Sequence, residues 1–108
     1  MEEQQVISAL AALAQPVRLR VFRALVIAGA SGMTPGTMAD GLGIPANTLS
    51  FHLKELASSG LVTQERSSRN LIYRAAYQQM YGLLSYLTEN CCAGTACAVE
   101  PSSAACSC

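Results

Sequence analysis

Apolar residues recur every three or four positions along the first part of the chain, which is the spacing of amphipathic helices. The pattern predicts one helix over residues 2–14 and a second, opened by a proline, over residues 16–28. A short third helix is expected over residues 34–42, because Thr34 is a favourable N-cap and Pro35 suits a first turn. The first part of the chain is therefore predicted to be helical.

The fourth predicted helix, residues 46–60, has two contrasting faces. Leu49, Leu53 and Leu56 fall on one side at about 100° per residue. The opposite side carries a polar set with one aromatic residue: Asn47, Phe51, Lys54 and Ser58. Two short helices joined by a Gly-Ile-Pro turn, the second polar on its outer face, indicate a helix-turn-helix.

The hydrophobic period changes after residue 60. Residues 61–75 alternate around the polar, basic segment Arg-Ser-Ser-Arg-Asn, which predicts a β-hairpin, and residues 77–90 return to a helical period. This order predicts a mostly α fold with a small β-hairpin, a winged helix-turn-helix, as one domain over residues 1–90. Residues 91–108 have no period and are expected to form a flexible, cysteine-rich tail.

Charge and composition indicate the kind of partner and the cellular location to expect. The net charge is zero, but all seven basic residues and only three acidic ones lie between positions 16 and 76, so this stretch carries 7 − 3 = +4. A basic middle favours a polyanionic partner. No apolar run is long enough for a membrane span and the N-terminus is polar, so we expect a cytoplasmic protein without a membrane partner.

All five cysteines lie in the last eighteen residues, at positions 91, 92, 97, 106 and 108. Clustered thiols in a reducing compartment indicate metal binding or redox chemistry more than a disulfide framework. Cys91, Cys92 and Cys97 match the three sulfurs that trivalent arsenic or antimony takes, and Cys106 or Cys108 would supply a fourth ligand for zinc or cadmium. Reversible redox sensing and a tail with no specific role are the alternatives.

No enzymatic activity is expected. His52 has no acidic partner at a catalytic spacing. The adjacent cysteines follow the C-terminus of a predicted helix, where the helix dipole opposes a thiolate, whereas oxidoreductases place a Cys-x-x-Cys at a helix N-terminus. No cofactor is required by this interpretation.

The sequence resembles the ArsR/SmtB family of bacterial metal- and metalloid-responsive repressors. The similarity lies in residues 12–25 (ALAQPVRLRVFRAL), 38–62 (MADGLGIPANTLSFHLKELASSGLV) and 66–75 (RSSRNLIYRA). It implies a homodimer that represses a metal(loid)-resistance operon and leaves its operator when an inducer binds. Two inducer sites common in the family are missing, since residues 35–42 hold no cysteine and residues 77–90 no aspartate or histidine. The tail cysteines would then bind the inducer, As(III) or a related thiophilic ion.

The fold places candidate DNA contacts on the second helix of the helix-turn-helix and on the wing. Base edges in the major groove are read near the start of such a helix, and Phe51 is suited to a thymine methyl group. For His52, a packed histidine and a DNA contact are both open. The full candidate set is Asn47, Thr48, Ser50, Phe51, His52, Lys54, Arg66 and Arg69.

The two terminal helices each carry an apolar stripe. These stripes are either core or a dimer interface, and a two-fold operator favours the interface. The candidate interface residues are Val6, Leu10, Leu13, Met80, Leu84 and Leu87.

Overall fold

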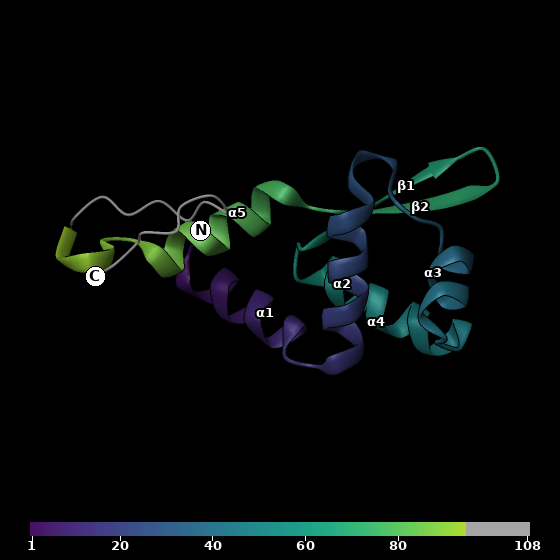
Figure 1. Cartoon of the computed structure of the whole chain (residues 1–108), viewed down its shortest axis with the longest axis horizontal. Helices are drawn as coiled ribbons and strands as arrows, with labels where there is room; N and C mark the ends of the chain where they lie inside the picture. Colours follow the sequence, from purple (N-terminus) through teal and green to yellow (C-terminus); the bar gives the residue numbers. More distant parts are fainter. Residues whose placement is uncertain (95–108) are drawn as a thin grey trace.

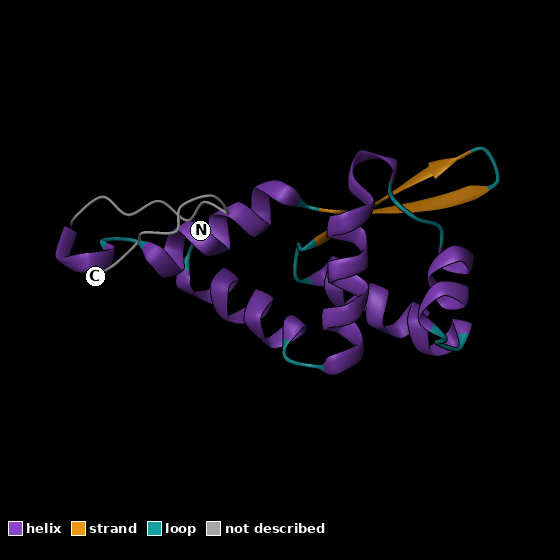
Figure 2. Cartoon of the chain, viewed as in Figure 1, coloured by secondary structure: helices purple, strands orange, loops and turns teal. Residues whose placement is uncertain are grey.

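The computed structural model describes residues 1–94 and has the predicted order of elements (Figures 1 and 2). The helices and strands are α1 (Glu3–Leu13), α2 (Pro16–Ala28), α3 (Pro35–Leu42), α4 (Ala46–Ser58), β1 (Val62–Ser67), β2 (Asn70–Ala75) and α5 (Tyr77–Thr88). Two short 3-10 turns, η1 (Gly29–Ser31) and η2 (Cys91–Gly94), follow α2 and α5. The mostly α fold with a small hairpin is confirmed.

Local signals set the helix ends where the sequence predicted them. The Thr34 side chain caps α3 by accepting a hydrogen bond from the Thr37 backbone N–H at 3.3 Å, with Pro35 in the first turn. At the end of α4, Gly60 adopts φ +84°. The backbone N–H of Leu61 then donates to the Leu56 carbonyl at 3.2 Å, which closes the helix with a Schellman pattern.

The core forms where α2 and α4 meet the neighbouring elements. The predicted apolar face of α4 is buried, with Leu49, Leu53 and Leu56 at most 1% exposed. Across from α4, helix α2 buries Val21 and Leu25. Burial of side chains of this size contributes about 1.5–3 kcal/mol each, so α4 is held firmly with its polar face outward.

The wing is a two-stranded antiparallel hairpin. Its register runs from Val62 opposite Ala75 to Ser67 opposite Asn70, which leaves Ser68 and Arg69 at the tip. The structure adds a contact that the sequence pattern did not predict. Met33, between η1 and α3, exchanges two backbone hydrogen bonds of 2.9 Å with Tyr73 of β2.

The two ends of the molecule differ in their elements. Helices α1 and α5 lie together at one end, while α3, α4 and the wing extend toward the other (Figure 1). Among residues 1–94, no helix combines the length and apolar character needed to cross a membrane.

Candidate nucleic-acid interface

The outer face of α4 presents the predicted polar set. Asn47, Thr48, Ser50 and Lys54 are all exposed. The Asn47 Oδ1 accepts a hydrogen bond of 2.9 Å from the Thr48 backbone N–H, which fixes the carboxamide at the start of the helix. Phe51 is 56% exposed in the middle of this face. The structure therefore exposes hydrogen-bonding groups and one aromatic ring on the helix that would enter a major groove.

His52 does not lie on that exposed face. Its side chain is only 7% exposed, and its Nδ1 lies 3.5 Å from Nη1 of Arg18. The Phe51 ring packs edge-on against it, with centroids 5.4 Å apart. This burial favours the packed alternative for His52 over a DNA contact. Its helical angle places it at the border of the buried stripe, and α2 covers that border.

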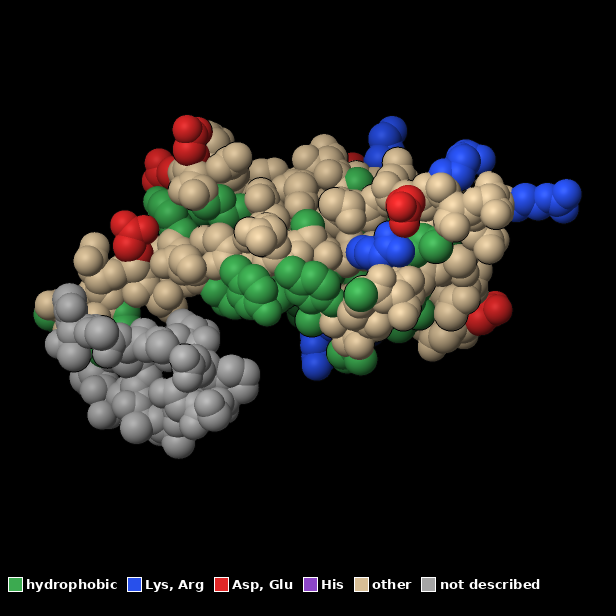
Figure 3. Space-filling view, turned by 90° about the horizontal axis from the view of Figure 1, so that it is seen from above, with side chains coloured by type: hydrophobic (Ala, Val, Ile, Leu, Met, Phe, Trp, Pro, Cys, Tyr) green, Lys and Arg blue, Asp and Glu red, His purple; other side chains and the backbone are tan. Residues whose placement is uncertain are grey.

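The wing carries two exposed arginines. Arg66 lies in β1 and Arg69 in the two-residue tip. On the face seen in Figure 3, all visible Lys and Arg side chains lie over the half of the molecule that carries the wing. Exposed guanidinium groups on a projecting hairpin are suited to phosphates or to a minor groove.

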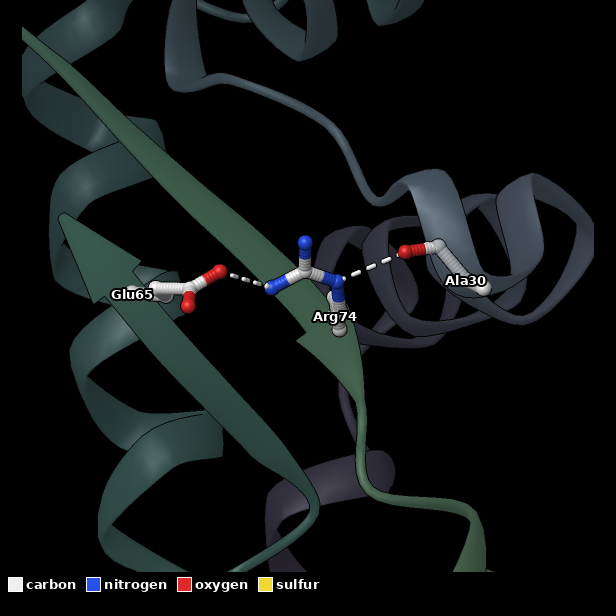
Figure 4. A network of polar contacts seen from close by, with 3 residues as sticks. All are labelled: Ala30, Glu65 and Arg74. Atoms are coloured by element: carbon white, nitrogen blue, oxygen red, sulfur yellow. Dashed lines mark hydrogen bonds and ion pairs between the residues drawn. The ribbon is translucent and has the colours of Figure 1, made fainter. Parts of the chain in front are cut away.

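Two other arginines are used inside the protein. The Nε of Arg18 donates to the Ala12 carbonyl at 2.6 Å, so this side chain joins the end of α1 to α4 through His52. Arg74 donates to the Ala30 carbonyl at 2.7 Å and pairs with Glu65 at 2.8 Å (Figure 4). The basic residues are therefore divided between structural and exposed groups, a division that sequence spacing did not reveal.

The terminal helices expose apolar side chains. Of the predicted interface residues, Leu10, Leu84 and Leu87 are 42%, 39% and 55% exposed, and Leu13 and Met80 are half-buried. Val6 is 4% exposed and packs in the core of its own chain, which corrects its assignment to the interface. The predicted interface set left out other exposed apolar residues, among them Ile7, Ile27 and Tyr81, because exposure of single side chains is not visible in a helical period.

An apolar groove of about 360 Å³ adjoins this surface. It lies between α2 and α5, and its lining includes Phe22, Val26, Met80 and Leu84, with Arg23 as its charged member. The groove shares Leu13, Met80 and Leu84 with the predicted interface residues, and exposed apolar surface of this kind usually marks a protein interface.

The two described cysteines follow the C-terminal end of α5. Cys91 and Cys92 belong to η2, and their Sγ atoms are 3.4 Å apart. Cys97, Cys106 and Cys108 fall outside the described residues. Within residues 1–94 no three His, Cys, Asp or Glu side chains gather as a metal site, so the predicted three-sulfur set extends beyond this part of the chain.

Comparison with known proteins places this geometry among transcriptional regulators. A family model described as a helix-turn-helix domain matches residues 13–65. Over 67 residues the chain is 40% identical to the HTH-type transcriptional repressor SmtB of Mycobacterium tuberculosis, a stretch that is 62% of this chain. It is 47% of that protein, so the chain spans about half the length of the curated relatives it matches.

Solved structures agree over more of the chain. An ArsR-like transcriptional regulator from Rhodococcus sp. RHA1 has a TM-score of 0.70 at 24% identity, over 78% of this chain and 76% of that one. A "possible transcriptional regulator for arsenical resistance" has a TM-score of 0.63 at 28% identity, over 74% and 80%. A homodimeric winged helix-turn-helix DNA-binding domain from Mycobacterium bovis, described as a possible ArsR-family regulator, has 0.62 at 27% identity, over 81% of each chain.

The chain has a winged helix-turn-helix fold and is similar to regulators described as ArsR-family or SmtB proteins. The helix-turn-helix match covers α2 through most of β1 and ends before α5 and the thiols. The similarity to known helix-turn-helix domains therefore covers the candidate nucleic-acid interface on α4, while the cysteines lie outside that match.

Proposed function

We propose that the protein is a dimeric transcriptional repressor that binds operator DNA through α4 and the wing. The observation that carries this proposal is the exposed face of α4, where Asn47, Ser50 and Lys54 surround Phe51 above a buried leucine stripe. Arg66 and Arg69 add exposed positive charge on the wing. Polar groups read base edges, while the cations neutralise phosphates.

The proposed dimer forms through α1 and α5. Exposed Leu10, Leu84 and Leu87 supply an apolar surface at the end of the molecule away from the wing. The Mycobacterium bovis domain with a similar fold is homodimeric. A two-fold dimer would present two α4 helices to half-sites about one helical turn apart, the arrangement that helix-turn-helix dimers use.

The proposed inducer is As(III) or a related thiophilic ion, bound by the thiolates of the tail. Cys91 and Cys92 lie side by side at the end of the last helix, and soft sulfur ligands select soft centres. Cys97 would supply the third sulfur, and Cys106 and Cys108 are the less favoured ligands. The similarity to a possible regulator for arsenical resistance supports this choice. Zinc or cadmium bound by four ligands, and a redox-sensing repressor, are the competing functions.

The position of the cysteines explains how inducer binding would release the operator DNA. They adjoin the C-terminal end of α5, and α5 packs against α1 at the proposed interface. An ion that ties the thiols together would change how the end of α5 packs, and with it the spacing of the two α4 helices. A coupling free energy of about 1–3 kcal/mol lowers operator affinity roughly 5- to 150-fold.

The test is fluorescence anisotropy of the reduced protein on a labelled duplex from upstream of its own gene. Arsenite, zinc and cadmium are titrated separately into the complex. We expect arsenite to release the DNA and zinc to have little effect, and we expect Cys91→Ser to bind DNA normally while losing the arsenite response. Release by zinc or cadmium, or by oxidation alone, would favour the competing functions. No binding to the duplex would refute the repressor.

A further inference from the structure

The base of the wing is fastened to the segment between α2 and α3 by several contacts. Met33 exchanges two backbone hydrogen bonds with Tyr73, as described above. Gly32 packs so closely against β2 that a Cβ atom there would lie 2.5 Å from the Tyr73 carbonyl oxygen. Arg74, the next residue of β2, reaches back to the Ala30 carbonyl in η1. The wing therefore meets the end of α2 over a short, dense contact.

Arg74 is the side chain that joins three segments at this contact. Its Nε donates to the Ala30 carbonyl at 2.7 Å and its Nη1 donates to the Glu65 carboxylate of β1 at 2.8 Å. Figure 4 shows the guanidinium between these two partners, one on each side. With the side chain 32% exposed, two of its hydrogen-bonding directions are used within the protein.

We propose that Arg74 is a positioning residue for DNA binding: it holds the wing on η1 so that Arg66 and Arg69 meet the phosphates, and it does not contact DNA itself. This inference rests on the proposed function. A two-stranded hairpin is marginally stable on its own. Without the Arg74 bonds the wing would be held at this contact by the Met33–Tyr73 backbone bonds and the packing of Gly32, and its two cations would sample a wider range of orientations. Ordering them beforehand removes part of the entropy cost of binding.

The proposal also gives a role to Glu65, the ion-pair partner of Arg74. It is an exposed carboxylate on the wing, 63% exposed, beside a surface that would face a polyanion. Simple electrostatics predicts that removing its charge strengthens DNA binding. As the partner of Arg74 it helps to hold the wing, and our proposal predicts that removing its charge weakens DNA binding. The two explanations therefore predict changes in DNA affinity in opposite directions when the Glu65 charge is removed.

The first arm of the test is a double-mutant cycle on the labelled upstream duplex. We expect Arg74→Met to weaken binding by up to about fivefold in the wild-type background, the range of one exposed charge interaction. In a background carrying Arg66→Ala and Arg69→Ala, the same change should have almost no further effect, because no wing cations remain to be positioned. An equal loss in both backgrounds, with the slope of log affinity against log salt reduced by about 0.9, would show that Arg74 contacts a phosphate and would overturn the proposal.

The second arm uses Glu65→Gln, which keeps the shape of the side chain and the fold. We expect weaker binding, by about twofold. Stronger binding would overturn the proposal. Amide hydrogen exchange without DNA keeps this result separate from the proposed function: we expect faster exchange in β1 and β2 of Arg74→Met while the α2 and α4 amides are unchanged. Faster exchange together with no DNA binding by the wild type would place the failure in the proposed function. Unchanged exchange in the wing would place it in the anchor.

Discussion

The two ends of the molecule expose opposite kinds of surface. At the end with α3, α4 and the wing, the exposed side chains include amides, hydroxyls and cations such as Asn47, Lys54 and Arg69. At the end with α1 and α5 they include large apolar side chains such as Leu87 and Tyr81, beside polar residues such as Gln78. Both ends pack on one core. Each surface is suited to a different external partner, a polyanion at one end and a protein at the other.

The two ends also differ in how their elements are held. The α4 helix buries a full leucine stripe and the wing is fastened to η1 by backbone and side-chain bonds. By contrast, α5 buries Leu83 and leaves Leu84 and Leu87 exposed. The end that carries the proposed DNA interface is therefore held together within one chain, whereas the α1–α5 end leaves apolar side chains exposed that the proposed dimer partner would cover.

The largest effect is expected when the apolar surface of α5 is disrupted. Replacing Leu84 and Leu87 together by glutamate should raise the dimer dissociation constant at least about 100-fold, since each leucine side chain contributes about 1.5–3 kcal/mol on burial. Sedimentation velocity measures the shift to monomer. Gln78→Glu is the matched control, because Gln78 lies on the opposite side of α5 and is exposed. A double variant that stays dimeric would contradict this assignment of the interface.

A smaller effect is expected at the other end, from Gly32→Ala. Gly32 and Gly29 have similar backbones, with φ of +66° and +70°, but an added Cβ meets β2 atoms only at Gly32 and finds no atom within 4 Å at Gly29. Both changes incur the cost of an unfavourable φ, and overpacking adds about 1–3 kcal/mol at Gly32 alone. Urea unfolding should therefore show Gly32→Ala to be the less stable. Equal losses would mean that the wing shifts freely against η1.

The smallest expected effects distinguish recognition of base edges by α4 from neutralisation of phosphates by the wing. Arg69→Ala should weaken binding to all duplexes by a similar factor and reduce the slope of log affinity against log salt by about 0.9. Asn47→Ala should reduce discrimination between the upstream duplex and a scrambled one by about 1–3 kcal/mol while leaving that slope unchanged. Anisotropy over a salt series measures both. Identical behaviour of the two variants would contradict a division of roles between α4 and the wing.

The sequence predicted the elements well because their signals are local. Thr34 caps α3 and Gly60 ends α4 through bonds to residues no more than five positions away. The leucine period correctly predicted the buried face of α4. Contacts between distant segments were out of reach: the Arg74–Ala30 bond spans 44 positions and Arg18–His52 spans 34. For the same reason the period put Val6 with exposed residues, although α1 packs that side chain into the core.

The candidate inducer site stays a prediction, because most of its cysteines lie outside the described residues. The notable feature of the tail is its composition, five cysteines without a hydrophobic period. Ligand choice depends on how sulfurs converge in space, and the described residues include Cys91 and Cys92 of that set. Counting cysteines indicates thiophilic chemistry. It does not distinguish a three-sulfur from a four-sulfur centre.

The most direct test of the two-ended account is the change in backbone amide NMR signals when the upstream duplex is added to the reduced protein. We predict that the perturbed amides lie at the start of α4, over residues 46–54, and around the wing tip, over residues 66–70. Amides of α1 and α5 should be nearly unchanged. Perturbations gathered on α1 and α5, with α4 and the wing silent, would contradict the account.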